Sequence, residues 1–168
     1  MRPHPSIRKA YPVDAPAISE LVQASFRAHI APDWQQEAQD AFFRETTAEK
    51  LVDPIAEATF AAAYEEHGHI VGVILLPRPN LVQLCFVATT HLRRGIGTSL
   101  WEAARTYLET HIPEVKTVEL NASPHAIAAY KAMGFFPISK PYRRRGAAAT
   151  RMACWLPART MESGPNAA

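Results

Sequence analysis

The sequence predicts a mixed α/β fold, in which helices flank one twisted, largely antiparallel sheet of about seven strands. Three observations support this class. The 168 residues are 48% hydrophobic and 20% charged, which is typical of a single globular domain. Short apolar runs with strand character are interspersed with segments of helical period. Their order, β-α-α-β-β-β-α-β-α-β-β, is not the repeating βαβ array of a parallel sheet.

The first third of the chain predicts a strand and three helices. Residues 7–10 form a short strand candidate, and Asp14 can cap the helix that follows. Residues 35–43 and 48–55 predict two further helices, the second behind the cap residue Thr47. The first helix carries a stripe of residues at helical spacing: Ile18, Leu21, Val22, Ser25, Phe26 and His29.

Three strands follow in the middle of the chain. Residues 59–64 and 70–76 are apolar runs of strand length. They flank the turn 66–69, in which Gly68 can adopt the positive φ that a tight hairpin needs. The third strand candidate spans residues 81–87.

The second half predicts two helices and three strands. Residues 96–109 form a helix with one apolar stripe, and residues 115–120 form the next strand. Ser123-Pro124 opens another helix with a hydroxyl at the cap and proline in the first turn, and Gly134 ends it. Two last strands follow, at residues 135–138 and 149–156.

These elements predict one domain over residues 5–158 and a flexible tail over 159–168. Residues 1–11 lack the apolar stretch of a signal peptide, and no run approaches the ~20 apolar residues of a membrane span. We therefore expect a soluble, cytoplasmic protein with no membrane partner. Cys85 and Cys154 lie in apolar strand candidates and are expected to be buried, reduced thiols. The seven histidines have no zinc-site spacing, so we expect no metal.

The charges are balanced overall but unevenly distributed. The formal net charge is +2, which makes nucleic acid an improbable partner for the chain as a whole. Residues 34–66 hold eight acids and two bases, which either attract a cationic amine or form solvated helix faces. Residues 120–161 hold seven bases and no acid. Within them, residues 142–146 predict a basic turn that either recognises an acidic acceptor, a phosphate or RNA, or is exposed, solubilising charge.

Residues 87–98 join a buried strand to a helix through a glycine-containing turn that suits an anion. Gly95 and Gly97 let the backbone approach a ligand, and the first helical turn presents unpaired N–H groups. Arg93 and Arg94 add positive charge. Several successive N–H donors fit a diphosphate better than a single phosphate. A Rossmann site would need a third glycine where Leu100 stands, and the Gly-x-x-x-x-Gly-Lys motif of nucleotide hydrolases is absent.

This turn resembles the signature of the GCN5-related N-acetyltransferase (GNAT) superfamily, Gln/Arg-x-x-Gly-x-Gly/Ala, which binds the diphosphate of acetyl-coenzyme A (acetyl-CoA). The first position is Leu92 rather than Gln or Arg, and Arg93 beside it is a candidate for the missing charge. By the same analogy the strands at 81–87 and 115–120 splay apart, which frees backbone groups for the pantetheine arm and the acetyl carbonyl. The coenzyme-binding residues implied are Phe86, Val87, Leu92, Arg93, Arg94, Gly95, Ile96, Gly97, Thr98, Ser123 and Tyr130.

Residues 117–135 resemble a second motif of this superfamily, a strand followed by a helix that carries tyrosine and ends in Gly-Phe. The resemblance implies that Tyr130 returns a proton to the coenzyme sulfur. A phenol, with reference pKa ~10, can donate to a departing thiolate of reference pKa ~8.5. The alternative is a core tyrosine, because Ile127, Tyr130 and Gly134 share a helix face. The resemblance covers residues 7–156 and is specific over 81–135.

The general base is not fixed by the sequence. Some members of the superfamily carry a glutamate on the strand before the glycine turn, where this chain has Gln83, which cannot accept a proton at neutral pH. Glu119, His125 or a chain of waters remain as candidates. Asn121 either orients the acceptor or that water, and so counts with Tyr130 as a catalytic candidate, or is a turn asparagine. The resemblance places acceptor contacts around Phe26, His29, Trp34, Phe42 and Phe43, most of which are equally suited to a core.

The resemblance implies transfer of an acetyl group from acetyl-CoA to a primary amine of a small molecule or protein, by direct attack in a ternary complex. Two alternatives stay open. One is a catalytically silent acyl-CoA sensor, which the missing glutamate favours. The other is an acetyltransferase for a macromolecular amine, tRNA-linked or protein, which residues 143–145 favour. The expected state is a monomer or homodimer.

Overall fold

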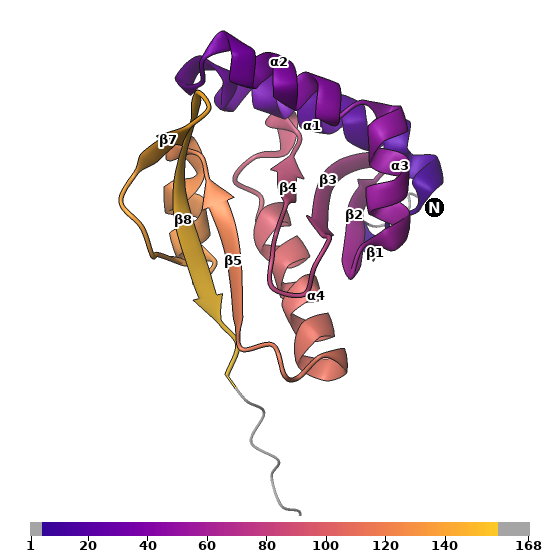
Figure 1. Ribbon diagram of the computed structural model, residues 1–168. Coiled ribbons are helices and arrows are strands. Elements are labelled where there is room, and N and C mark those ends of the chain that lie inside the picture. Colours follow the sequence, from indigo (N-terminus) through magenta and orange to yellow (C-terminus); the bar gives the residue numbers. More distant parts are fainter. Residues whose placement is uncertain (1–4, 158–168) are drawn as a thin grey trace, which may run out of the picture.

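The computed structural model describes residues 5–157, which form two antiparallel sheets flanked by helices (Figure 1). The predicted tail 159–168, and residue 158 of the predicted domain, lie outside the described residues. The first sheet has the order β1-β2-β3-β4: Ser6–Lys9, Phe60–Glu66, His69–Leu76 and Leu84–Val87. In the second, β8 (Ala147–Trp155) pairs with β5 (Thr117–Ala122), β6 (Phe136–Pro137) and β7 (Tyr142–Arg144).

Five α-helices within the described residues cover the sheets. They are α1 (Ala15–His29), α2 (Gln36–Glu45), α3 (Ala48–Glu57), α4 (Ile96–His111) and α5 (Ile127–Ala132). Helices α1 and α3 pack on one face of the first sheet and α4 packs on the other. Strand β3 is therefore buried on both faces, which explains its unbroken apolar sequence rather than an alternating one.

The predicted fold class is confirmed, with differences in strand number and bounds. The structure has eight strands in two sheets where about seven in one were expected. The strand predicted over 81–87 begins only at Leu84, while Leu81 makes isolated bridges. Strand β7 lies where a basic turn was predicted. The three consecutive arginines indicated a solvated turn, but Arg143 and Arg144 pair with Ala148 and Ala147 of β8. The turn itself is Arg145–Gly146, both with positive φ.

Of the three predicted helix caps, one makes the expected hydrogen bond to its helix and two do not. Thr47 accepts a hydrogen bond from the N–H of Lys50 at 3.4 Å, as predicted. Ser123 makes no capping bond, and a 3₁₀ turn, Pro124–Ala126, precedes α5. Asp14 stands at the cap position of α1 but makes no bond into that helix.

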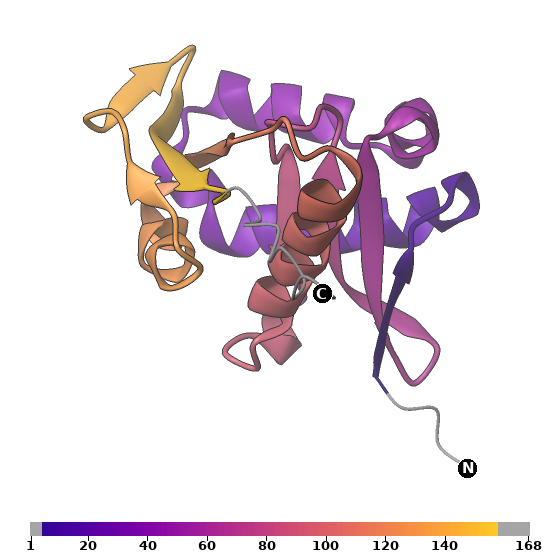
Figure 2. The same cartoon turned by 90° about the horizontal axis from the view of Figure 1, so that it is seen from below.

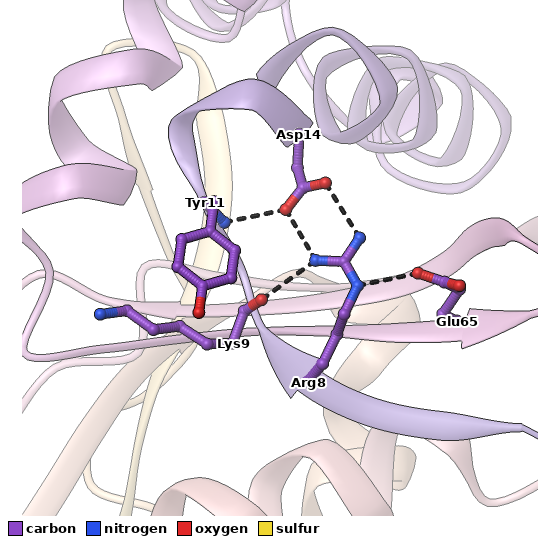
Figure 3. A network of polar contacts seen from close by, with 5 residues as sticks. All are labelled: Arg8, Lys9, Tyr11, Asp14 and Glu65. Carbon is purple, nitrogen blue, oxygen red and sulfur yellow. Dashed lines mark hydrogen bonds and ion pairs between the residues drawn. The ribbon is translucent and has the colours of Figure 1, made fainter.

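The carboxylate of Asp14 instead joins three segments at the start of the fold (Figure 3). It accepts two hydrogen bonds from the guanidinium of Arg8, at 2.8 and 2.9 Å, and one from the N–H of Tyr11 at 2.8 Å. Arg8 also donates to Glu65 at 2.8 Å. The hydrogen bonds from Arg8 lower the pKa of Asp14. The network thus ties β1 to β2 and to the start of α1.

A close approach between β3 and α4 depends on Gly72. A Cβ at this position would lie 2.8 Å from Cγ2 of Ile96 and 3.0 Å from Cδ1 of Leu100. Only glycine therefore allows the first turn of α4 to pack against β3 at this depth. This contact sets the position of the turn that precedes α4.

The two sheets meet at one end and separate at the other. Val82 donates to the carbonyl of Glu119 and Glu119 to that of Asn80, both at 2.9 Å, and Leu81 and Glu119 form a parallel bridge. Beyond this point β4 pairs only with β3, and β5 only with β8. Figure 2 shows the second sheet, in orange and yellow, set off to one side of the first. The predicted splay of these two strands is confirmed.

No helix within residues 5–157 is both long and apolar enough to cross a bilayer.

Candidate functional site

A cavity of about 460 Å³ opens where β4 and β5 separate. Its walls come from α1, β4, β5, α5 and the β7–β8 hairpin. At one end it reaches Leu92 and Gly97, at the start of α4. Tyr130 lines it as well, and Asn121 and His125 are on its wall at the end of β5 and beyond. One cavity therefore joins the predicted anion turn to the predicted catalytic residues.

The turn before α4 has the geometry of an anion cradle. Arg93 and Gly95 both have positive φ, 60° and 75°, an arrangement that directs successive N–H groups into a concavity. Gly95 is the N-cap of α4 and contributes no side-chain cap, so the N–H groups of Ile96, Gly97 and Thr98 have no partner within the helix. A Cβ at Gly95 would meet nothing within 4 Å. The backbone here is open to a ligand and suits a diphosphate.

Some side chains of this turn are already engaged in other contacts and are not free to bind a ligand. Arg94 donates to the carboxylate of Glu66 at 2.7 and 3.1 Å, and His91 lies 2.9 Å from the same carboxylate. The hydrogen bond from Arg94 lowers the pKa of Glu66. Ile96 is buried against β3, so only its backbone can reach a ligand. Arg94 therefore anchors the turn to the β2–β3 hairpin through its side chain.

Tyr130 lies against Cys85 in the wall of the cavity. Burial raises the pKa of Tyr130 well above its usual value, and the neighbouring Cys85 adds to the shift. Burial likewise raises the pKa of the Cys85 thiol to about 12, although a hydrogen bond with Tyr130 opposes this. Both groups are therefore neutral at pH 7. Cys85 was predicted to be an inert core thiol, and the structure instead makes it part of the cavity wall.

The register of β4 shows which backbone groups face the gap. Ala88 donates to the carbonyl of Val71, so Val87 and Gly72 are a non-hydrogen-bonded pair of the β3–β4 ladder. The N–H groups of Val87 and Cys85 therefore point away from β3. Phe86 is the residue whose backbone pairs with β3, which corrects the prediction that its backbone is free; its side chain lines the cavity.

The carbonyl of Val87 is not free either, because it accepts a hydrogen bond from Oγ of Ser25 on α1 at 2.9 Å. The N–H of Val87 is thus its only backbone group open to a ligand. Ser123, at the far side of the gap, is 7% exposed and its Oγ has no partner among the described residues. A polar group buried this way costs free energy unless a ligand or water completes it.

Two histidines stack in the wall of the cavity. The rings of His29 and His125 lie 4.7 Å apart at an angle of 4°, and both line the cavity. Nε2 of His29 is buried with no partner in the described part of the chain. Asn121 accepts a hydrogen bond from Tyr142 at 3.0 Å, which leaves its amide N–H groups available. The sequence did not predict the histidine pair, because 95 residues separate its members.

Four of the five residues placed near the acceptor by resemblance line the cavity: Phe26, His29, Trp34 and Phe42. Phe43 does not, although its ring packs edge-on against Phe26. The ring centroids of Phe26 and Phe42 are 3.8 Å apart, and Trp34 packs edge-on against both. The aromatic residues are therefore core and cavity wall at once.

The candidate bases differ in their access to this cavity. Glu119 is paired with Arg151 at 2.8 Å and is not part of the cavity wall. Gln83 and His125 are on the wall. Among residues 5–157 no group of three metal-ligating side chains is close enough to hold a metal ion.

A family model for the acetyltransferase (GNAT) domain matches residues 30–156. The chain belongs to this family. The matched range includes both the anion turn and the helix that carries Tyr130. It supports acyl-CoA-dependent acetyl transfer as the activity. No curated protein sequence matches the chain.

Solved structures agree with the GNAT fold at low sequence identity. A GCN5-related N-acetyltransferase from Rhodopseudomonas palustris has 21% identity and a TM-score of 0.78, over 93% of this chain and 98% of that one. The PaiA N-acetyltransferase of Thermoplasma acidophilum, solved with coenzyme A, has 16% identity and a TM-score of 0.74, covering 91% and 99%. The ribosomal-protein-S18-alanine N-acetyltransferase of Escherichia coli has 18% identity and a TM-score of 0.67, covering 97% and 98%.

Proposed function

We propose that this GNAT protein transfers an acetyl group from acetyl-CoA to a primary amine, which attacks the thioester while both substrates are bound. The observation that carries the proposal is the continuity of the cavity. Its wall includes Gly97 beside the anion turn together with Cys85, Tyr130, Asn121 and His125. A donor held at one end and an acceptor at the other would meet at Tyr130.

The donor end is built mainly from backbone. The N–H groups of Gly95, Ile96, Gly97 and Thr98 are positioned for the diphosphate, with Arg93 as the exposed cation beside them. The N–H of Val87 is suited to the thioester carbonyl, where negative charge develops during attack. Leu92 and Ser123 complete this half, one as an apolar contact and the other as an unpaired hydroxyl.

Tyr130 is proposed as the general acid. Its raised pKa keeps the phenol protonated across the neutral range, so a proton is always available for the departing thiolate. The adjacent Cys85 stays a neutral thiol, because burial raises its pKa to about 12, and so adds no negative charge beside that thiolate.

His125, stacked on His29, is proposed to take the proton that the attacking amine loses. Both rings line the cavity, and an imidazole nitrogen can act as a proton acceptor. Glu119 is disfavoured, since Arg151 already occupies its carboxylate outside the cavity. Asn121 is placed to orient the amine or a water beside His125.

Thioester consumption in the presence of a panel of primary amines tests the proposal. Amine-dependent release of coenzyme A, with N-acetylated product detected by mass spectrometry, is the expected result. Tight acetyl-CoA binding without any amine-dependent release would instead identify a catalytically silent sensor.

A further inference from the structure

The acceptor end of the cavity carries no negative charge. Among the described residues, no aspartate or glutamate is part of the cavity wall. The wall instead contains two histidines and the guanidinium-bearing Arg144. An acceptor with several ammonium groups would find no carboxylate here to bind its second cation.

The acidic residues of the segment 34–66 are used elsewhere. Glu65 pairs with Arg8 and Glu66 with Arg94. The other six are exposed and face solvent on α2 and α3: Glu37, Asp40, Glu45, Glu49, Asp53 and Glu57. Their position favours the solvated-face interpretation of the acidic segment over attraction of a cationic amine.

The side chain of Arg144 differs from those of Arg143 and Arg151 in having no partner among the described residues, and from that of Arg145 in lining the cavity. Arg143 donates to the carbonyls of Asp33 and Gly146, and Arg151 pairs with Glu119. The side chain of Arg144 makes no hydrogen bond or ion pair with any residue in the range 5–157, and Arg144 lines the cavity from β7. A guanidinium in this position matches the planar geometry of a carboxylate.

The cavity wall also contains apolar groups. Phe26, Trp34 and Phe42 supply an aromatic wall, and the small side chains of Ala147 and Ala149 line the cavity as well. Such a wall binds a hydrophobic body by burying its apolar surface.

We propose that the acceptor is a free amino acid or similar small molecule, with a primary amine, a carboxylate bound by Arg144 and an apolar body held by the aromatic wall. This inference rests on the proposed function. In the transfer, the amide C–N bond forms as the thioester C–S bond breaks. His125 takes one proton from the amine and Tyr130 returns one to the sulfur, which gives an N-acetyl amino acid and free coenzyme A.

Steady-state kinetics with matched acceptors test this inference. Phenylalanine, phenylalaninamide and spermidine are compared on the full chain and on two variants, Arg144→Gln and Arg145→Gln. Both variants remove one positive charge from the same hairpin, but Arg145 is not part of the cavity wall. The amide keeps the amine and the ring and lacks only the carboxylate.

We expect phenylalanine to exceed phenylalaninamide in kcat/KM by about tenfold, which corresponds to about 1.4 kcal/mol. Arg144→Gln should abolish that preference by raising KM for phenylalanine about tenfold more than KM for the amide. Arg145→Gln should keep it. Equal effects of the two variants would overturn the role of Arg144.

The remaining outcomes separate this inference from the function beneath it. A preference for spermidine, or for the amide as a mimic of a peptide N-terminus, contradicts the amino acid acceptor while leaving acetyl transfer intact. If the protein binds acetyl-CoA but acetylates none of these amines, the proposed function is contradicted. The acceptor assignment is then contradicted as well.

Discussion

Tyr130 and Cys85 lie together in the cavity wall, and burial keeps both protonated at neutral pH. The hydroxyl of Tyr130 is therefore assigned to the transfer step and not to the binding of the diphosphate. In the proposed reaction this hydroxyl protonates the departing sulfur, whereas the diphosphate is proposed to bind at the N-terminus of α4. Loss of the hydroxyl should therefore affect turnover and not binding.

We predict that Tyr130→Phe lowers kcat by about 100-fold, in the range that general acids contribute, with an unchanged Kd for acetyl-CoA. Stopped assays of coenzyme A release give kcat, and calorimetry gives the Kd. An unchanged kcat would mean that Tyr130 is a core tyrosine that happens to line the cavity.

His125 has a different role and a different signature. We predict that His125→Gln lowers kcat/KM about 100-fold at pH 7, since glutamine keeps a hydrogen-bonding group but accepts no proton. The deficit should shrink as pH rises, because more of the free amine is already deprotonated. His69→Gln, on the exposed β2–β3 turn, is the matched control. A deficit that is the same at every pH would point to a structural role.

At the scale of elements, the Arg8–Asp14 network stabilises the junction of β1 with α1 (Figure 3). Because Arg8 lowers the pKa of Asp14 in the folded state, its contribution is complete above the unfolded value near 3.8 and is lost as pH falls through the lower folded value. We predict that Asp14→Asn costs about 1 kcal/mol at pH 7, since Arg8 is partly exposed, and much less near pH 2.

Urea unfolding at the two pH values measures this difference. Asp53→Asn, which changes an exposed carboxylate on α3, should cost little at either pH. A cost for Asp14→Asn that does not depend on pH would show that the ion pair contributes nothing.

The contact of α4 with β3 connects stability to ligand binding. We predict that Gly72→Ala costs about 1–3 kcal/mol and weakens acetyl-CoA binding, because the added Cβ displaces Ile96 and with it the first turn of α4. Ile55→Val, in the core cluster on the other face of the sheet, should cost about 1 kcal/mol with the affinity unchanged. Chemical unfolding and calorimetry on the same samples separate the two effects. Unchanged affinity in Gly72→Ala would contradict the coupling.

The sequence predicted those elements whose signals are local. The two closely spaced glycines, Gly95 and Gly97, identify the anion turn directly from the sequence. The cap residue Thr47 likewise identifies a helix start. Strand β7 was missed because consecutive arginines are typical of a solvated turn, whereas Arg143 and Arg144 pair with Ala148 and Ala147 across a tight hairpin. The positive φ of Arg93 was also missed, since a side chain other than glycine rarely adopts it.

The parts of the site that could not be predicted depend on contacts between distant segments. Cys85 and Tyr130 come together where the two sheets separate. His29 stacks on His125 because α1 packs beside that gap. Neither pairing follows from periodicity or spacing along the chain.

At the scale of the whole molecule, the two sheets meet around Leu81 and Glu119 and are separate beyond that point. A ligand that fills the gap would contact both sheets and so stabilise the folded chain. The account therefore depends most on acetyl-CoA occupying this gap with its diphosphate at the start of α4.

Isothermal titration of acetyl-CoA into the wild-type protein and into Gly95→Glu measures this most directly. Glutamate would place bulk and negative charge in the open space beside the N-cap, at a positive φ that glycine tolerates best. The account predicts micromolar binding to the wild type and none to the variant, with both proteins folded by circular dichroism. Absence of binding by the folded wild type, or equal binding by the two proteins, would contradict it.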